Sequence, residues 1–216
     1  MVTRMDRSVG RIVEKLATLG LEKNTLVIFT SDNGPTHNVG GADSTFFHSA
    51  GPLRGLKGSL YEGGIRIPFI ASWPGVIKPG SRCDERLYFP DMLPTLCELA
   101  GQRPPADIDG VSFLPTLLGK GEQKHHDCLY WEFPAYGGQQ AVIAGNWKAV
   151  RQNLAKGIVK TELYDLAADE NETNDLAAKH PDVVARLEKL LKDQHTPSRD
   201  FPLQAIDAPV QKKNKK

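Results

Sequence analysis

The sequence predicts an α/β fold in two parts: the last strands of a partial mixed sheet with helices, then a small antiparallel sheet plus a C-terminal helix. Three observations predict it. Up to about residue 120, helical and strand patterns alternate, as they do in α/β domains. From residue 128 on, short strand-like segments follow one another with glycine turns between them. A last amphipathic helix is predicted at residues 181–191.

The first two elements are a helix and a strand. Apolar side chains recur at helical spacing over residues 2–19, and Gly20 is a typical helix stop. The uninterrupted apolar run at Leu26–Phe29 is typical of a parallel strand buried on both faces, although a short buried helix segment has a similar pattern. The Val-Ile-Phe content and the break at Gly34 favour the strand. A second apolar run at residues 65–73 predicts the next strand.

The later elements are shorter. Residues 91–99 predict a helix with Pro94 in its first turn, where the missing N–H does no harm. Strands are predicted at residues 128–133, 140–144, 146–151 and 159–166. Such a sheet needs a covering layer, and the helix that begins at Pro181 supplies one. Lys148 and Arg151 in the third of these strands are expected to lie on a solvated face.

Composition excludes several classes of protein. The 216 residues are 40% hydrophobic and 25% charged, as in soluble globular proteins, and the net charge of +1 recruits neither nucleic acid nor an anionic membrane. No apolar stretch approaches the roughly 18 residues of a membrane span, and no signal peptide is visible at Met1. Cys83, Cys97 and Cys128 have neither CxxC spacing nor an even number, so plain buried thiols are expected.

Asp32 and Asn33 directly follow the first strand. In open α/β sheets, ligands bind just beyond the carboxyl ends of the strands. Carboxylate and amide oxygens are the ligands that hard cations such as Ca²⁺ and Mg²⁺ prefer, whereas a turn needs the same residue types for backbone reasons. Two ligands do not fill a calcium shell of roughly 6–8 oxygens, so a metal site here needs further ligands.

A second polar segment is rich in glycine. Residues 54–66 interleave four glycines with Arg54, Lys57 and Arg66. Glycines let the backbone approach a ligand closely, and a lone lysine is a compact charge suited to an oxyanion. The segment contains no GxxxxGK[ST] pattern, so it is not a Walker loop.

These two segments carry a family resemblance. SDNGP at residues 31–35, followed by FFHSAGPLRGLKGSLYEGGIRIPFIASWPG at residues 46–75, resembles the central motif block of the sulfatases. These are arylsulfatase-type sulfuric ester hydrolases of the alkaline-phosphatase-like superfamily. FPDMLPTLCELAG at residues 89–101 resembles the helix that closes the large domain, and GNWKAVRQ at residues 145–152 resembles part of the small C-terminal subdomain. The resemblance implies the C-terminal part of that fold.

The resemblance also implies roles for single residues. Asp32 and Asn33 correspond to ligands of the active-site calcium. Lys57 corresponds to the lysine that contacts the sulfate, and it would act in catalysis by offsetting charge on the sulfuryl oxygens and the departing alkoxide. Tyr61–Gly64 would shape a turn. His37 lies where relatives often carry a substrate-facing histidine, and a plain surface-loop histidine is the alternative.

The family nucleophile has no counterpart in this sequence. Sulfatases oxidise a Cys or Ser in a C/S-x-P/A-x-R element to formylglycine, and none of the cysteines or serines here has that context. The sequence therefore resembles roughly the C-terminal two-fifths to one-half of a sulfatase, as a truncated gene model, a split gene or a separate piece would. This chain alone is expected to be inactive. The family resemblance implies a periplasmic or extracellular location.

Domain bounds follow from composition and resemblance together. Residues 1–122 are predicted to be the C-terminal part of the catalytic α/β domain, and residues 123–205 a small antiparallel-sheet subdomain. The low-hydrophobicity stretch at residues 119–127 marks their boundary. Residues 206–216 are predicted to be a disordered basic tail.

Three functions remain open from the sequence. The first is a sulfatase that hydrolyses aryl sulfates or sulfated carbohydrates with calcium and formylglycine. The second is a metallo-phosphohydrolase of the same superfamily, which normally uses two zinc ions; Asn33, where those enzymes tend to place a histidine, argues against it. The third is a non-catalytic remnant that folds or binds a partner without chemistry.

Overall fold

The computed structural model describes residues 2–207 and divides into two compact units. The first comprises the residues up to 32 together with 68–125, and the second comprises 33–67 together with those from 126 on. The domain bounds predicted from the sequence stay a prediction. The basic tail predicted for 206–216 lies, from residue 208 on, outside the described residues.

The first unit begins with helix α1 (Val2–Thr18) and the turn η1 (Glu22–Asn24), which lead into strand β1 (Val27–Thr30). β1 pairs with β2 (Phe69–Ser72) in an antiparallel sheet, with Thr30 opposite Phe69. The parallel arrangement predicted for these strands is therefore wrong. The chain returns to the sheet at the same end at which it left, so β2 begins where β1 stops. β2 is also shorter than the strand predicted at residues 65–73, and Ile65 at the start of that run belongs to the helical turn α2 (Glu62–Ile65).

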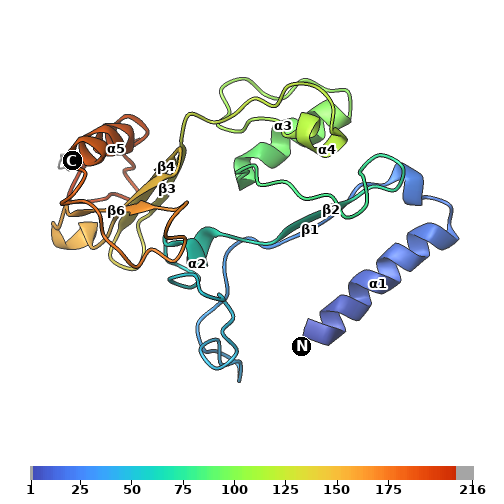
Figure 1. The fold of residues 1–216 in the computed structure, drawn as a ribbon, viewed down its shortest axis with the longest axis horizontal. Coiled ribbons are helices and arrows are strands. Elements are labelled where there is room, and N and C mark those ends of the chain that lie inside the picture. Colours follow the sequence, from blue (N-terminus) through green and yellow to red (C-terminus); the bar gives the residue numbers. More distant parts are fainter. Residues whose placement is uncertain (1, 208–216) are drawn as a thin grey trace, which may run out of the picture. The chain divides into compact units, whose positions relative to one another are not determined.

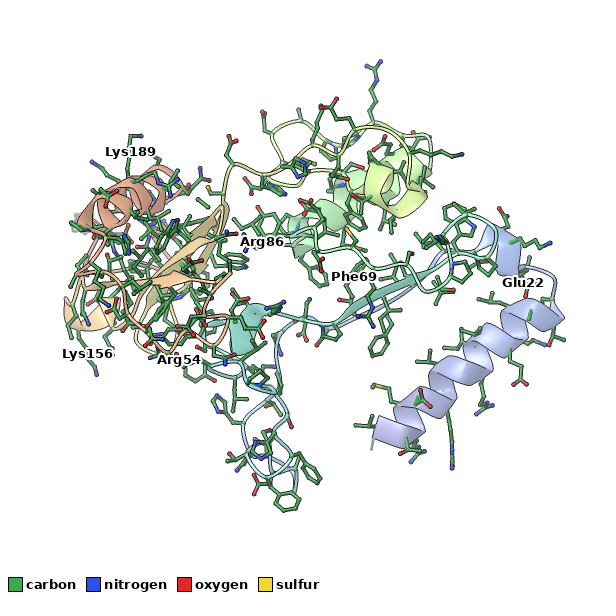
Figure 2. The ribbon with its side chains drawn as sticks, viewed as in Figure 1. Glu22, Arg54, Phe69, Arg86, Lys156 and Lys189 are labelled. Atoms are coloured by element: carbon green, nitrogen blue, oxygen red, sulfur yellow. The ribbon has the colours of Figure 1, made fainter. Side chains whose placement is uncertain are left out.

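Burial in this unit is lower than the sequence predicts. β1 is half-buried and β2 is mostly exposed, so neither has the two covered faces expected of it. α1 has no buried residue, and its apolar positions are open, with Ile12 59% exposed. Figure 2 shows the side chains of α1 standing clear of the strands of the same unit. Helical spacing therefore identified the apolar stripe of α1, but within residues 2–207 nothing covers it.

The rest of the first unit is organised by a buried carboxylate. Asp91 ends the turn η2 (Phe89–Asp91) and precedes α3 (Met92–Leu99), and it is fully buried. Its two oxygens accept hydrogen bonds from the N–H groups of Tyr88 (2.9 Å) and Val111 (2.8 Å). Thr95 Oγ1 accepts another from Phe113 N–H at 2.9 Å. These bonds fix the segment before α4 (Leu114–Leu118) against α3.

The second unit contains a four-stranded antiparallel sheet covered by one helix (Figure 1). Its strands pair in sequence order: β3 (Leu129–Phe133), β4 (Gln139–Ala144), β5 (Trp147–Arg151) and β6 (Thr161–Asp165), with the turn η3 (Leu154–Lys156) before the last. Helix α5 (Pro181–Asp193) packs on β4, β5 and β6. The core between them contains Val142, Ala149, Leu163, Leu187 and Leu191. The predicted antiparallel sheet and its covering helix are confirmed.

The cysteines differ from one another in burial. All three are free thiols, but Cys83 is exposed while Cys97 and Cys128 are partly buried. The expectation of buried thiols is therefore wrong for Cys83, which lies in the irregular segment after β2. Burial, together with the charge of Asp127, raises the pKa of the Cys128 thiol. Within residues 2–207 no helix is both long and apolar enough to cross a membrane.

The segment that follows α5 returns to the sheet through a histidine. His195 lies between two carboxylates: its Nδ1 faces Glu132 of β3, and its Nε2 lies 2.6 Å from Asp207 Oδ1. Tyr130 and Gln140 also contact the Glu132 carboxylate. Burial by itself lowers the pKa of His195, but its hydrogen bonds to the two carboxylates outweigh burial and raise the pKa. The two ring nitrogens of His195 therefore tie residues 195–207 to the sheet.

A raised histidine pKa predicts the direction of the pH dependence of folding. The stabilisation is complete below the ordinary histidine pKa of about 6.5 and is lost as the pH rises through the higher pKa of the folded state. His195→Gln should therefore flatten the decline in unfolding free energy across this range, measured by urea unfolding at a series of pH values. His48→Gln, in an exposed loop, is the control. A decline that is equally steep in His195→Gln would contradict this assignment.

Candidate functional site

Asp32 and Asn33 follow β1 directly, as the sequence predicts. Asp32 is exposed and Asn33 is half-buried. Asn33 Nδ2 donates a hydrogen bond to the carbonyl of Gly34 at 2.8 Å. Because an amide nitrogen only donates, the Asn33 side-chain oxygen is the atom suited to a cation.

Gly34 brings this segment into contact with the glycine-rich loop. Its N–H donates to the carbonyl of Gly64 at 2.9 Å. A Cβ on Gly34 would lie 2.0 Å from the carbonyl oxygen of Gly63, so no other residue fits without moving the backbone. Gly63 and Gly64 are packed as closely, against the carbonyl oxygens of Gly55 and Ser59. Gly34 therefore serves the contact between the two motifs, and Gly63 and Gly64 serve close backbone contacts within the glycine-rich loop.

Lys57 lies on a loop that is fixed on both sides. Its own N–H donates to the carbonyl of Pro35 at 2.8 Å. On the other side, the buried amide of Gln139 donates to the Gly58 carbonyl at 2.8 Å and accepts from Leu60 N–H at 3.2 Å. The Lys57 side chain itself is exposed. The backbone of Lys57 is thus fixed beside the segment that begins at Asn33, and its side chain is left in solvent.

His37 lies three residues beyond Gly34 and is also exposed. Its ring centroid is 6.5 Å from that of Tyr136, in the turn between β3 and β4. This contact and the Lys57 loop place two of the predicted site residues in the second unit. Their roles stay predictions.

A buried ion cluster fixes the end of the glycine-rich loop. The Lys148 side chain is fully buried, and its Nζ lies 2.8 Å from an oxygen of Glu62 and 2.8 Å from an oxygen of Glu172. Glu172 also accepts a hydrogen bond from the Glu62 backbone N–H at 2.6 Å. Burial raises the pKa of Glu172, and the charge of Lys148 opposes that rise. Lys148 therefore does not lie on a solvated face.

Arg54, which is labelled in Figure 2, fixes the start of the glycine-rich loop. Its guanidinium lies 3.7 Å from the centre of the Tyr61 ring and donates to Tyr164 Oη at 2.8 Å and the Glu172 carbonyl at 3.0 Å. The Tyr61 hydroxyl donates to Glu162 at 2.5 Å. Burial, followed by this hydrogen bond, raises the pKa of Tyr61 well above the ordinary range, so the phenol stays neutral. Tyr61 is structural, as the resemblance implies.

Sequence reasoning missed the residues that support the loop. Neither Gln139 nor Glu172 was predicted to support the loop, although Glu172 lies in a stretch that resembles the C-terminal subdomain of sulfatases. The sequence did contain an indication that Lys148 is buried, because residues two apart on a strand share a face and Val150 is a core residue. Arg151 was also expected on a solvated face, but it is 8% exposed and pairs with Glu188 at 2.9 Å.

The side chains at the end of β1 are of the type that binds a hard cation, but they are too few to complete its coordination shell. A carboxylate and an amide oxygen are appropriate ligands for Ca²⁺. Among residues 2–207 no group of three or more His, Cys, Asp or Glu side chains is arranged to hold a metal ion. Asp32 and Asn33 could therefore supply part of a calcium shell, and its other ligands would have to come from elsewhere.

Two family models match this sequence. The sulfatase model matches residues 1–102, and the model for the C-terminal region of N-sulphoglucosamine sulphohydrolase matches residues 56–197. The N-acetylgalactosamine-6-O-sulfatase of Bacteroides thetaiotaomicron is 36% identical over 215 residues, covering 91% of this chain. The chain spans 41% of that relative's length.

Solved structures agree with this family. The structure of Ps i-CgsB in complex with k-i-k-neocarrahexaose has a TM-score of 0.74 at 30% identity, over 92% of this chain and 43% of its own. A protein solved with its substrate D-glucosamine-2-N,6-O-disulfate has a TM-score of 0.73 at 25% identity, over 89% of this chain and 38% of its own.

Removing the buried ammonium should destabilise the second unit. Lys148→Met leaves two buried carboxylates unpaired, which costs about 3–5 kcal/mol in comparable buried pairs. The free energy of unfolding in urea measures this loss. Lys156→Met, at an exposed lysine of η3, should change it by less than about 0.5 kcal/mol.

A triple variant separates lost charge pairing from lost packing. Adding Glu62→Gln and Glu172→Gln to Lys148→Met removes the unpaired charges and should recover part of the stability. Equal stability of Lys148→Met and Lys156→Met would refute the role of this cluster.

Proposed function

Because this chain belongs to the sulfatase family, we propose that it contributes calcium-ligating and sulfate-binding residues to an enzyme that hydrolyses sulfate esters of carbohydrates. The observation that carries the proposal is the hydrogen bond from Lys57 N–H to the Pro35 carbonyl. It holds the lysine of the glycine-rich motif beside the segment that begins at Asn33, although the two are far apart in sequence.

Each residue has a separate task in the proposed reaction. Asp32 and Asn33 would supply oxygen ligands to calcium, and the chemistry that calcium would supply there is Lewis-acid polarisation of the sulfuryl oxygens. Lys57 contacts the sulfate through its ammonium group. Charge builds up on the sulfuryl oxygens and the departing alkoxide as the S–O bond breaks, and a fixed ammonium stabilises that charge.

The preference for carbohydrate rests on the relatives and on the open site. One of the two similar structures is in complex with its substrate D-glucosamine-2-N,6-O-disulfate, and the other is in complex with k-i-k-neocarrahexaose. His37 is exposed beside Lys57's loop, where it could donate a hydrogen bond to a sugar hydroxyl or a sulfate oxygen. We also propose a periplasmic or extracellular location, as the family resemblance implies.

The role of Lys57 is tested in an intact sulfatase that carries the same GLKGSLYEGG motif. Substituting the lysine that corresponds to Lys57 with alanine should lower kcat by roughly 10²–10³, the usual loss for one transition-state charge donor. Calcium content, measured by elemental analysis, should stay unchanged.

The matched variant in the same enzyme replaces the aspartate that corresponds to Asp32 with alanine. It should lose calcium and activity together. Unchanged kcat in the lysine variant, or full calcium content in the aspartate variant, would overturn the assigned roles.

The 216-residue polypeptide by itself should not turn over a sulfate ester. No residue in it lies in the sequence context from which sulfatases make formylglycine, so the covalent step of the family has no nucleophile. The measurement is product release from an aryl sulfate with purified protein and calcium. Turnover that disappears on substitution of Cys83, Cys97 or Cys128 would contradict this expectation.

A further inference from the structure

Tyr136 occupies a backbone conformation that suits glycine. It lies in the turn between β3 and β4 with φ at +50°, followed by Gly137 and Gly138, whose φ values are +90° and +75°. A bulky residue with positive φ is strained, and such strain gathers at functional sites. Tyr136 is also 69% exposed, so burial of its ring does not compensate for the strain. Folding alone does not explain a tyrosine here.

The ring of Tyr136 lies among the residues proposed to contact substrate. It is 6.5 Å from the His37 ring, between centroids, and tilted to it by 39°. It also covers Gly58, the neighbour of Lys57, so closely that a Cβ on Gly58 would lie 2.8 Å from Tyr136 Cε2. An exposed aromatic side chain is thus adjacent to the Lys57 loop and to His37.

The turn that carries this ring is fixed in place. Leu154 N–H donates to the Gly138 carbonyl at 3.1 Å, and Ala155 N–H donates to the Gly137 carbonyl at 2.9 Å. The Tyr136 ring stacks on that of Phe133, with centroids 5.7 Å apart and planes 27° apart. The ring therefore needs little ordering when a ligand binds, which favours binding.

We propose that Tyr136 is a specificity-determining residue that packs against the sugar ring whose sulfate is bound at Lys57. A pyranose has a face of C–H groups that packs well on the electron-rich face of an aromatic ring. An aryl group would favour an enclosed apolar pocket, whereas the exposed ring of Tyr136 leaves the hydroxyls of a sugar in water. This inference rests on the proposed function, because it requires sulfate to bind at Lys57.

The test uses this chain and two probes, inorganic sulfate and N-acetylgalactosamine 6-sulfate, titrated with detection by NMR. Tyr136→Gly should lower the affinity for the sulfated sugar roughly threefold to tenfold, the range expected for the loss of one aromatic contact. The same substitution should leave the affinity for inorganic sulfate unchanged. Tyr136→Phe, which keeps the ring, should bind both probes like the parent chain, and Lys57→Ala should weaken both.

Thermal unfolding separates this role from a structural one. Glycine adopts positive φ without strain, so Tyr136→Gly should melt at the same temperature as the parent chain or higher. A lower melting temperature together with equal weakening of both probes would overturn the inference, because Tyr136 would then be structural.

Three further outcomes distinguish this inference from the proposed function. Equal affinity of the parent chain and Tyr136→Gly for the sulfated sugar, with sulfate binding still dependent on Lys57, overturns the inference alone. The same holds if phenyl sulfate loses more affinity than the sugar in Tyr136→Gly. Failure of the parent chain to bind either sulfate or the sulfated sugar counts against the proposed function and overturns the inference with it.

Discussion

The ammonium group of Lys148, buried between the carboxylates of Glu62 and Glu172, is the interaction on which the glycine-rich loop depends. A charge in this position is tolerated only because its partners are equally buried and hydrogen-bonded. The cluster joins β5 to α2 and to the segment after β6. It therefore couples the folding of the C-terminal sheet to the conformation of a loop more than eighty residues earlier.

Contacts that require glycine determine how close the two motifs come. Gly34 and Gly64 meet backbone to backbone, and a single added carbon at Gly34 would overlap the Gly63 carbonyl. The Lys57 loop is then held by a main-chain bond to Pro35 on one side and by the side chain of Gln139 on the other, while the Lys57 side chain stays in water. A rigid backbone with a solvent-exposed charge is an arrangement suited to binding an anion, because the geometry exists before the ligand arrives.

The two units differ in how well they bury their apolar side chains. The second encloses a core between its sheet and α5, with Val142, Leu163 and Leu187 almost wholly buried. The first leaves the apolar stripe of α1 and much of β2 exposed within the described residues. The relatives that the chain matches are more than twice as long, so the same apolar pattern has more chain to pack against in those proteins. Burial inferred from pattern alone therefore succeeded only in the second unit.

Local chemistry in the sequence determined most elements: the helix period of residues 2–19, the turn glycines between β3, β4 and β5, and the stripe of α5 each follow from short-range patterns. The motif resemblance identified Asp32, Asn33 and Lys57 as candidates. Only the tertiary structure decided that β1 and β2 are antiparallel, that Lys148 is buried and that Tyr136 lies beside the Lys57 loop. These depend on contacts between residues distant in sequence, and the pattern around one residue does not encode which partner will reach it.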